Sequence, residues 1–166
     1  MKKNVELVVV MTILLTIFTG GCGSNPSVSP ARQGTVWEGN GHSYEVFNTN
    51  MSWTEARRFA EQRGGYLVTI TSSDEQAFIE SLLSRNGTVF AYWLGGFRGN
   101  DGNFRWVTGE QFVYTNWAPG EPNNSAGIEN YIEFVRNTGQ WNDVREDYHR
   151  MHISWNTNMG FIIEWD

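Results

Sequence analysis

The order of the periodic segments constrains this chain most, because two helical patterns come first and only short strand patterns follow. Ser52 and Glu55 form a capping-box pair before one helical stripe of apolar residues, and Ser72 and Glu75 form a second pair before another stripe. Most of the later periodic segments have the length of strands. This order predicts an α+β domain whose two chain ends pair as neighbouring strands.

The predicted strands are short, and turn residues separate them. Residues 36–47 alternate bulky and polar side chains around a GNG turn, which indicates a hairpin. The later strand segments are YLVTI, YWLGGF, FRW, NYIEFV, QWNDV and GFIIEW. Residues 108–128, between FRW and NYIEFV, include a segment rich in Pro, Gly and Asn that cannot run as a helix or a central strand. We therefore expect one long loop in the second half of the domain.

Composition and charge exclude some classes of protein. The 166-residue chain is 40% hydrophobic, which suits one globular domain with a short additional segment. Its 18 Asp and Glu outnumber its 12 Lys and Arg, so no basic stripe is available to neutralise phosphates. We therefore expect no nucleic-acid partner.

The first residues have the layout of a secretory signal. An apolar run from Leu7 to Phe18 follows two lysines and is too short for a comfortable membrane span. Small residues then lead to Cys22, and this arrangement resembles a bacterial lipoprotein signal. The resemblance implies cleavage before Cys22, a lipid on its thiol, and an exported protein held by that anchor at the outer membrane or cell surface; secretion is the alternative. Residues 22–35 predict a flexible linker before a domain of residues 36–166.

An acidic residue stands among turn formers in WAPGEPNN, residues 117–124, and turn chemistry does not require it. Oxygen-bearing side chains continue from this loop into the later strands, and the set is Glu121, Asn123, Glu129, Asn142 and Asp143. Calcium prefers carboxylate and amide oxygens, which irregular loops supply from several directions. Sulfur and imidazole, which would favour zinc, are absent from this set. Local hydrogen bonding within the loop is the alternative explanation of these residue types.

Several motifs in a fixed order resemble the C-type lectin-like domain over residues 36–166. They are GGYLVTI, YWLGGF, FRWVTGEQFVYTNWAPGEPNN, ENYIEF, QWNDV and GFIIEW. The resemblance implies an α+β fold with two helices, short antiparallel sheets and a long calcium-binding loop. Sugar-binding members of the family carry Glu-Pro-Asn or Gln-Pro-Asp in that loop, and residues 121–123 are Glu-Pro-Asn here.

The resemblance also implies roles for individual residues. It makes the principal calcium ligands Glu121, Asn123, Glu129, Asn142 and Asp143, and it places a cis peptide bond before Pro122. The first four ligands would also bind two adjacent sugar hydroxyls. The carboxylates would accept hydrogen bonds from these hydroxyls, and the amides would donate hydrogen bonds to them. The order of Glu and Asn implies mannose, glucose, N-acetylglucosamine or fucose rather than galactose. Shallow sites of this kind gain avidity from several copies, as in a homo-oligomer.

The family's usual disulfides cannot form, because Cys22 is the one cysteine of the chain. Ala60, Tyr131 and Ile163 stand where relatives commonly carry cysteines. We expect apolar packing of Ala60 against Ile163 to take the place of one bridge.

Other residues near the loop have simpler interpretations. His149 and His152 form an H-x-x-H pair, which we interpret as a solvated surface feature. Asn124 stands where some relatives place an aspartate for an auxiliary calcium, which argues against a second ion. Trp117 is expected to pack in the core, whereas Trp155 is a candidate to stack on a sugar.

Three classes of function follow from these residues. A calcium-dependent lectin uses the complete five-ligand set. A protein-binding or adhesion module on the same fold is the alternative, since a fold does not fix a function. An enzyme is not expected: Glu121 and Glu129 could in principle act as acid and base, but both are better explained as ligands, and nothing pairs a nucleophile with a base.

Overall fold

The computed structural model describes residues 34–148 and 158–166. The predicted signal and Cys22, nearly all of the predicted linker, and His149, His152 and Trp155 lie outside the described residues. The helices are α1 (Trp53–Glu61) and α2 (Ser73–Asn86), with a short 3-10 helix η1 (Ser125–Gly127). The strands are β1 (Thr35–Val36), β2 (Ser43–Phe47), β3 (Tyr66–Leu67), β4 (Ala91–Arg98), β5 (Phe104–Trp106), β6 (Tyr131–Val135), β7 (Trp141–Val144) and β8 (Met159–Trp165).

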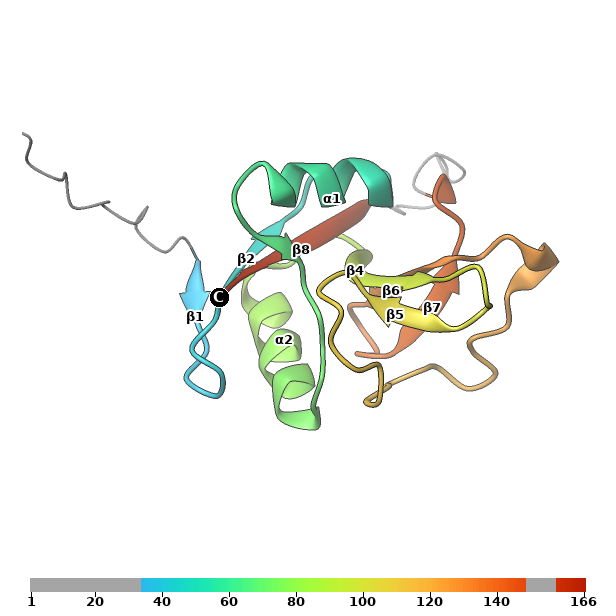
Figure 1. The fold of residues 1–166 in the computed structure, drawn as a ribbon. Helices are drawn as coiled ribbons and strands as arrows, with labels where there is room; N and C mark the ends of the chain where they lie inside the picture. Colours follow the sequence, from blue (N-terminus) through green and yellow to red (C-terminus); the bar gives the residue numbers. More distant parts are fainter. Residues whose placement is uncertain (1–33, 149–157) are drawn as a thin grey trace, which may run out of the picture. The chain divides into compact units, whose positions relative to one another are not determined.

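The strands form one sheet in the order β1-β2-β8-β4-β6-β7, with β3 also paired to β8 and β5 to β4. The N-terminal hairpin of β1 and β2 therefore lies beside the last strand, as predicted for the chain ends, and β2 pairs antiparallel with β8 (Figure 1). The sheet is mainly antiparallel, as expected, with one parallel pair, β4 and β8. The apolar pattern of β8 indicates burial but carries no information about the direction of the strand beside it.

Apolar side chains cover both faces of this sheet and form two core clusters. Along β8, Ile162 joins one cluster while Phe161 and Ile163 join the other. The first cluster includes buried side chains of α2, and the second includes those of α1. Figure 1 shows the two helices on opposite sides of the β2–β8 pair. This two-sided burial explains why residues 160–163, GFII, do not alternate between apolar and polar side chains.

The two helix starts differ in a way that the sequence does not indicate. At α1, Ser52 accepts from the backbone N–H of Glu55, and the Glu55 carboxylate accepts from the N–H of Ser52, so the predicted capping box is complete. At α2, Ser72 accepts from the backbone N–H of Glu75. One Glu75 oxygen, however, accepts from the hydroxyl of Tyr44 at 2.7 Å, and the other accepts from the backbone N–H of Thr71 at 2.8 Å instead of closing the box at Ser72. The second prediction is half right, because the carboxylate bonds to Thr71 and Tyr44 rather than to the N–H of Ser72.

Apolar and aromatic contacts occupy the places of the missing cysteines. Ala60 and Ile163 are both fully buried in the α1-side cluster, as expected for packing in place of a bridge. Tyr131 stacks on Trp53, with ring centroids 4.5 Å apart. Burial of these side chains holds α1 against the sheet without a covalent link.

Two consecutive glycines bring β4 close to its neighbours. A Cβ atom at Gly96 would lie 2.2 Å from Cδ1 of Ile132, and one at Gly95 would lie 2.4 Å from the carbonyl oxygen of Leu67. The pairing of β4 with β6 shifts register between Trp93 and Phe97, on either side of these glycines. Beyond this shift, the end of β4 contacts the end of the long loop, where the backbone N–H of Arg98 donates to the carbonyl of Asn130.

Within the described ranges, no helix is both long enough and apolar enough to cross a membrane.

Candidate functional site

The long loop between β5 and β6, drawn in yellow to orange in Figure 1, is fixed at its middle to the edge strand β7. The backbone N–H of Trp141 donates to Asn116 at 2.8 Å, and the N–H of Ala118 donates back to Trp141 at 2.8 Å. Trp117 packs edge-on against the Trp141 ring and tilts against Phe104. The prediction that Trp117 packs in the core is confirmed, and its burial anchors the segment that leads into Glu-Pro-Asn.

Asp143 is the deepest of the predicted ligands, and it connects the loop to β7. Its side chain is fully buried. Oδ1 accepts from the backbone N–H of Asn123 and Oδ2 from that of Asn124, each at 2.9 Å. Because bonds from N–H groups to a carboxylate are stronger than neutral ones, this carboxylate fixes the turn that follows the proline.

Glu121 and Asn123 form a local pair across the proline. The peptide bond between Glu121 and Pro122 is cis. One Glu121 oxygen accepts from the backbone N–H of Asn123 at 3.0 Å, and the other accepts from its side-chain amide at 2.8 Å. Asn123 is exposed and Glu121 is half-buried, so both side chains can be reached from solvent.

Glu129 is held by the turn before it. Its carboxylate accepts from the N–H of Ser125 at 2.7 Å, and its own N–H donates to the side chain of Asn124 at 3.1 Å. Asn124 has φ 47, in the left-handed region that asparagine tolerates better than most residues. Asn124 thus has a structural role that explains its presence at this position.

Asn142 lies on β7 and leads to a residue that the sequence interpretation missed. Its amide nitrogen donates to Oε1 of Glu133 on the neighbouring strand β6 at 3.0 Å. Glu133 is only 2% exposed, and its other oxygen has no hydrogen-bond partner among the described residues. Burial raises the Glu133 pKa to about 7, with the charges of Glu129 and Glu121 adding to the effect. The one signal in the sequence was an acidic residue at an interior position of NYIEFV.

The charges of the three predicted carboxylate ligands act on one another. The pKa of Glu129 is raised, first by burial and further by the negative charges of Asp143 and Glu121. The N–H of Ser125 and the guanidinium of Arg98 act in the opposite direction. A cation among these groups would relieve the mutual repulsion. Arg98 is the second residue that sequence reasoning missed, since nothing in its local pattern marks it.

The donor set fits a hard divalent cation in its chemistry. It offers carboxylate and amide oxygens from a loop and an adjacent strand, as calcium prefers. Among the described residues, however, no three or more His, Cys, Asp or Glu side chains are grouped as metal ligands. Glu121, Glu129 and Asp143 turn oxygens toward backbone N–H groups instead. Ion binding would require at least some of these oxygens to exchange an N–H partner for the metal.

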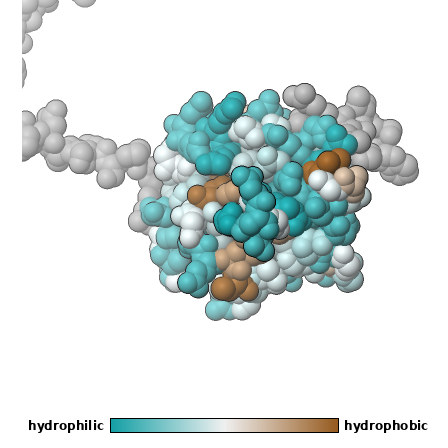
Figure 2. Space-filling model, turned by 45° about the vertical axis from the view of Figure 1, so that its right-hand side comes forward, coloured by the Kyte–Doolittle hydropathy of each residue, from teal (hydrophilic) through white to brown (hydrophobic). Residues whose placement is uncertain are grey.

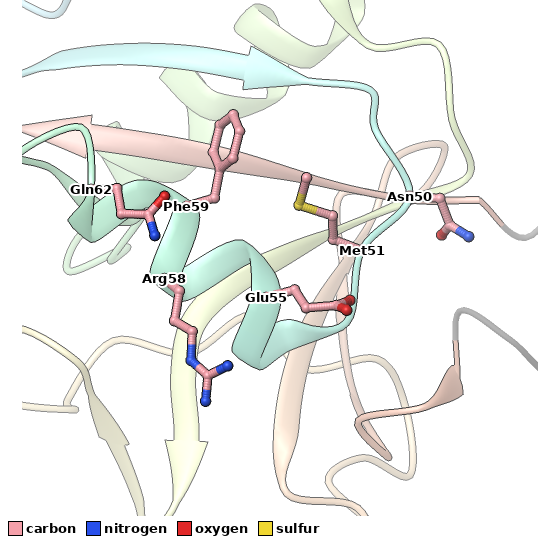
Figure 3. Close-up of a pocket in the computed structure, with 6 residues that line it drawn as sticks. All are labelled: Asn50, Met51, Glu55, Arg58, Phe59 and Gln62. Atoms are coloured by element: carbon pink, nitrogen blue, oxygen red, sulfur yellow. The ribbon is translucent and has the colours of Figure 1, made fainter.

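A hollow lies elsewhere on the domain, where α1 meets the segment that precedes it. The residues that line it are Asn50, Met51, Glu55, Arg58, Phe59 and Gln62 (Figure 3). None of the predicted ligands contributes to it. The predicted ligands therefore lie apart from this hollow.

Comparison with known families assigns this architecture. The model of the Lectin C-type domain matches residues 49–153. The chain belongs to the C-type lectin domain family. The C-type lectin lectoxin-Lio1 of Erythrolamprus poecilogyrus is 33% identical to it over 137 residues, which make up 79% of this chain and 81% of that protein.

Solved C-type lectin structures share the fold. CEL-I from Cucumaria echinata matches with a TM-score of 0.68 at 24% identity, over 83% of this chain and 97% of CEL-I. The carbohydrate-recognition domain of cow CD23, solved in the presence of a GlcNAc2Man3 oligosaccharide, matches with a TM-score of 0.60 at 27% identity, over 75% of this chain and 87% of that chain. A calcium-independent type II antifreeze protein has the same fold, with a TM-score of 0.64 at 21% identity over 83% of this chain and 94% of that one. The fold by itself therefore does not establish calcium binding. These named organisms are eukaryotic, so they give no support to the predicted bacterial origin.

Proposed function

We propose that this C-type lectin domain binds sugars in a calcium-dependent manner through the loop and β7. The observation that carries the proposal is the Glu121-Pro122-Asn123 segment, in which Asn123 bonds both to Glu121 and, through its backbone N–H, to the buried Asp143. The other proposed ligands are Glu129 and Asn142. A bound calcium would supply a positive centre that accepts lone pairs from two adjacent sugar hydroxyls.

The chain's own residues would orient the sugar around that centre. Glu121 and Glu129 accept hydrogen bonds from the sugar hydroxyls, and the side-chain amide of Asn123 donates a hydrogen bond to a hydroxyl oxygen. Asn142 has two amide hydrogens, and Glu133 can accept one of them while the other reaches the sugar. Glu133 would thereby fix the orientation of Asn142. The order of acceptor and donor in Glu-Pro-Asn supports mannose-type sugars with equatorial vicinal hydroxyls.

We further propose that the domain is displayed by an exported, lipid-anchored protein. The support is the layout of the first 21 residues and the position of Cys22. A shallow site of this kind binds weakly, so several copies on one surface would provide avidity. The partners we propose are therefore the glycans of another surface, with contact to the protein's own membrane only through the lipid.

The alternative, a protein-binding module, would need an exposed apolar patch on the loop. Val113, 75% exposed, and Ile128, 44% exposed, are the large hydrophobic side chains of the described loop that face solvent. Figure 2 shows a largely hydrophilic face on which apolar areas are small and separate. Isolated exposed hydrophobic residues are common on soluble proteins and do not mark an interface. The carboxylate chemistry of the loop therefore favours the lectin over the alternative, and binding over catalysis.

Calorimetric titration tests this proposal. Calcium is titrated into the chelator-treated protein, followed by mannose and then galactose, with the Glu121→Ala, Asn142→Ala double variant as a control. We expect wild type to bind calcium and then mannose in preference to galactose, and the variant to bind neither sugar. A folded wild-type protein that takes up no calcium would contradict the proposal and favour the protein-binding alternative.

A further inference from the structure

Arg98, at the end of β4, joins three separate segments around the candidate site. Its Nη2 donates to Oδ2 of Asp143 at 2.6 Å, its Nε to the carbonyl of Glu129 at 3.0 Å, and its Nη1 to the carbonyl of Gly102 at 3.0 Å. The guanidinium also lies 4.3 Å from the centre of the Phe104 ring. The side chain is 15% exposed, so these contacts hold a largely buried cation in one orientation.

Two of the three oxygens that Arg98 binds belong to proposed calcium ligands. Asp143 is the residue that also receives the backbone N–H groups of Asn123 and Asn124. The guanidinium therefore supports, through Asp143, the turn that follows the cis proline, and through Glu129 the far end of the same loop. The guanidinium presents its N–H groups in a rigid planar fork that fixes the directions of several hydrogen bonds, whereas the ammonium group of a lysine has three donors without that planar geometry.

The charge of Arg98 should act against a bound calcium. The guanidinium lies 2.6 Å from a carboxylate oxygen of Asp143, and a positive group so close to the proposed ligands repels a divalent cation. Two opposite effects on calcium affinity therefore come from one side chain. Removing the charge alone would strengthen calcium binding, whereas losing the position of Asp143 and Glu129 would weaken it.

We propose that Arg98 is a positioning residue that holds the sugar-binding loop in its binding conformation before any ion binds. The inference rests on the proposed function for its calcium readout. Its contacts with Asp143, Glu129 and Gly102 join protein groups alone, so we expect its effect on the order of the loop in chelator as well as with calcium. We expect the positioning of Asp143 and Glu129 to affect calcium affinity more than charge repulsion does. Groups that hydrogen-bond to metal ligands commonly change metal affinity by about 10–100-fold.

The sign of the change in calcium affinity tests the proposal. Arg98→Met removes the fork and the charge, and Arg105→Met is the matched control, because Arg105 pairs with the exposed Asp101 at 2.7 Å. Calorimetry should show calcium bound about tenfold more weakly by Arg98→Met and with wild-type or slightly higher affinity by Arg105→Met. Equal or tighter binding by Arg98→Met is what charge repulsion alone predicts, and it would overturn the proposal.

Amide hydrogen exchange in chelator provides a second readout that needs no calcium. We expect the Asn123 and Asn124 amides to exchange at least about tenfold faster in Arg98→Met than in wild type, with the β2–β8 amides unchanged. If Arg98→Met disturbs β2–β8 as well, Arg98→Lys, which keeps the charge but lacks the fork, is measured instead with the same expectation. Unchanged protection in the informative variant would overturn the proposal. Failure of wild type to bind calcium would contradict the proposed function but leave this measurement valid.

Discussion

Two groups of acidic side chains in this domain are held in different ways. The core carboxylates are Glu75 on α2 and Glu164 on β8, which are 2% and 1% exposed. Both accept hydrogen bonds from the hydroxyl of Tyr44, at 2.7 and 3.1 Å. Glu164 also contacts His42 and Thr69. The loop carboxylates, Glu121, Glu129 and Asp143, are bonded mainly to backbone N–H groups and to Arg98, and two of the three are half-buried.

The difference in exposure indicates that one group of carboxylates contributes to folding stability and the other is available to bind a ligand. The core carboxylates are almost fully buried, and they accept from the Tyr44 hydroxyl and from the backbone N–H groups of Thr69 and Thr71, so an outside ligand cannot reach them. The loop carboxylates face solvent at Glu121 and Glu129, and the N–H groups that they use can be exchanged for an ion. Similar acidic side chains thus stabilise the fold at one place and are available for binding at the other.

The largest effect expected from this comparison is on folding stability. Glu75→Ala leaves the buried Tyr44 hydroxyl without one of its acceptors and should lower the free energy of unfolding by about 3 kcal/mol, with calcium affinity unchanged. Glu55→Ala, at the same position of α1, removes an exposed cap and should cost about 0.5–1 kcal/mol. Urea unfolding in chelator measures both. Equal costs for the two variants would show that a core carboxylate contributes no more to folding stability than an exposed helix cap does.

The converse variant affects binding rather than folding. Glu129→Ala should weaken calcium binding about 100-fold, or about 2.7 kcal/mol, because it removes a proposed ligand. Its stability in chelator should change by less than about 1 kcal/mol, since Glu129 is partly exposed. Calorimetry and urea unfolding on the same preparation decide the outcome. Wild-type calcium affinity in this variant would remove Glu129 from the site.

The pH dependence of stability provides a smaller effect. Burial raises the pKa of Glu164 to about 7 from its ordinary value of 4.5, with the charge of Glu75 adding to the effect and bonds from His42, Thr69 and Tyr44 opposing it. Below pH 4.5 the group is protonated in both states, so its contribution is fully present. As pH rises from 4.5 toward 7 the unfolded chain loses the proton that the folded protein keeps, and stability falls by about 2.5 kcal/mol.

Glu164→Gln isolates this contribution. In chelator, the difference in the free energy of unfolding between wild type and Glu164→Gln should change by that amount between pH 4.5 and 8. Glu61→Gln, an exposed change on α1, should leave the pH profile as it is in wild type. A wild-type profile in Glu164→Gln would mean that Glu164 does not hold a proton in the folded protein at neutral pH.

Much of the fold could be predicted from local patterns. The Ser52 capping box and the hairpin of residues 36–47 follow from periodicity and turn residues, because these signals act over a few positions, whereas the pairing of the chain ends was predicted from the order of the elements. The second capping box was only half right, since the Glu75 carboxylate bonds to Thr71 and to Tyr44, 31 residues away. A local pattern does not show which distant side chain will compete for such a carboxylate.

The sequence by itself determined the α+β order of elements, the impossibility of disulfides, and a set of oxygen donors around Glu-Pro-Asn, because residue type and spacing carry that information. Only the tertiary structure decided that β4 and β8 are parallel, that Glu133 lies behind Asn142, and that Arg98 reaches Asp143. These features depend on contacts between segments tens of residues apart along the chain or on neighbouring strands. Local periodicity cannot encode which distant side chains will meet, and folding brings them together.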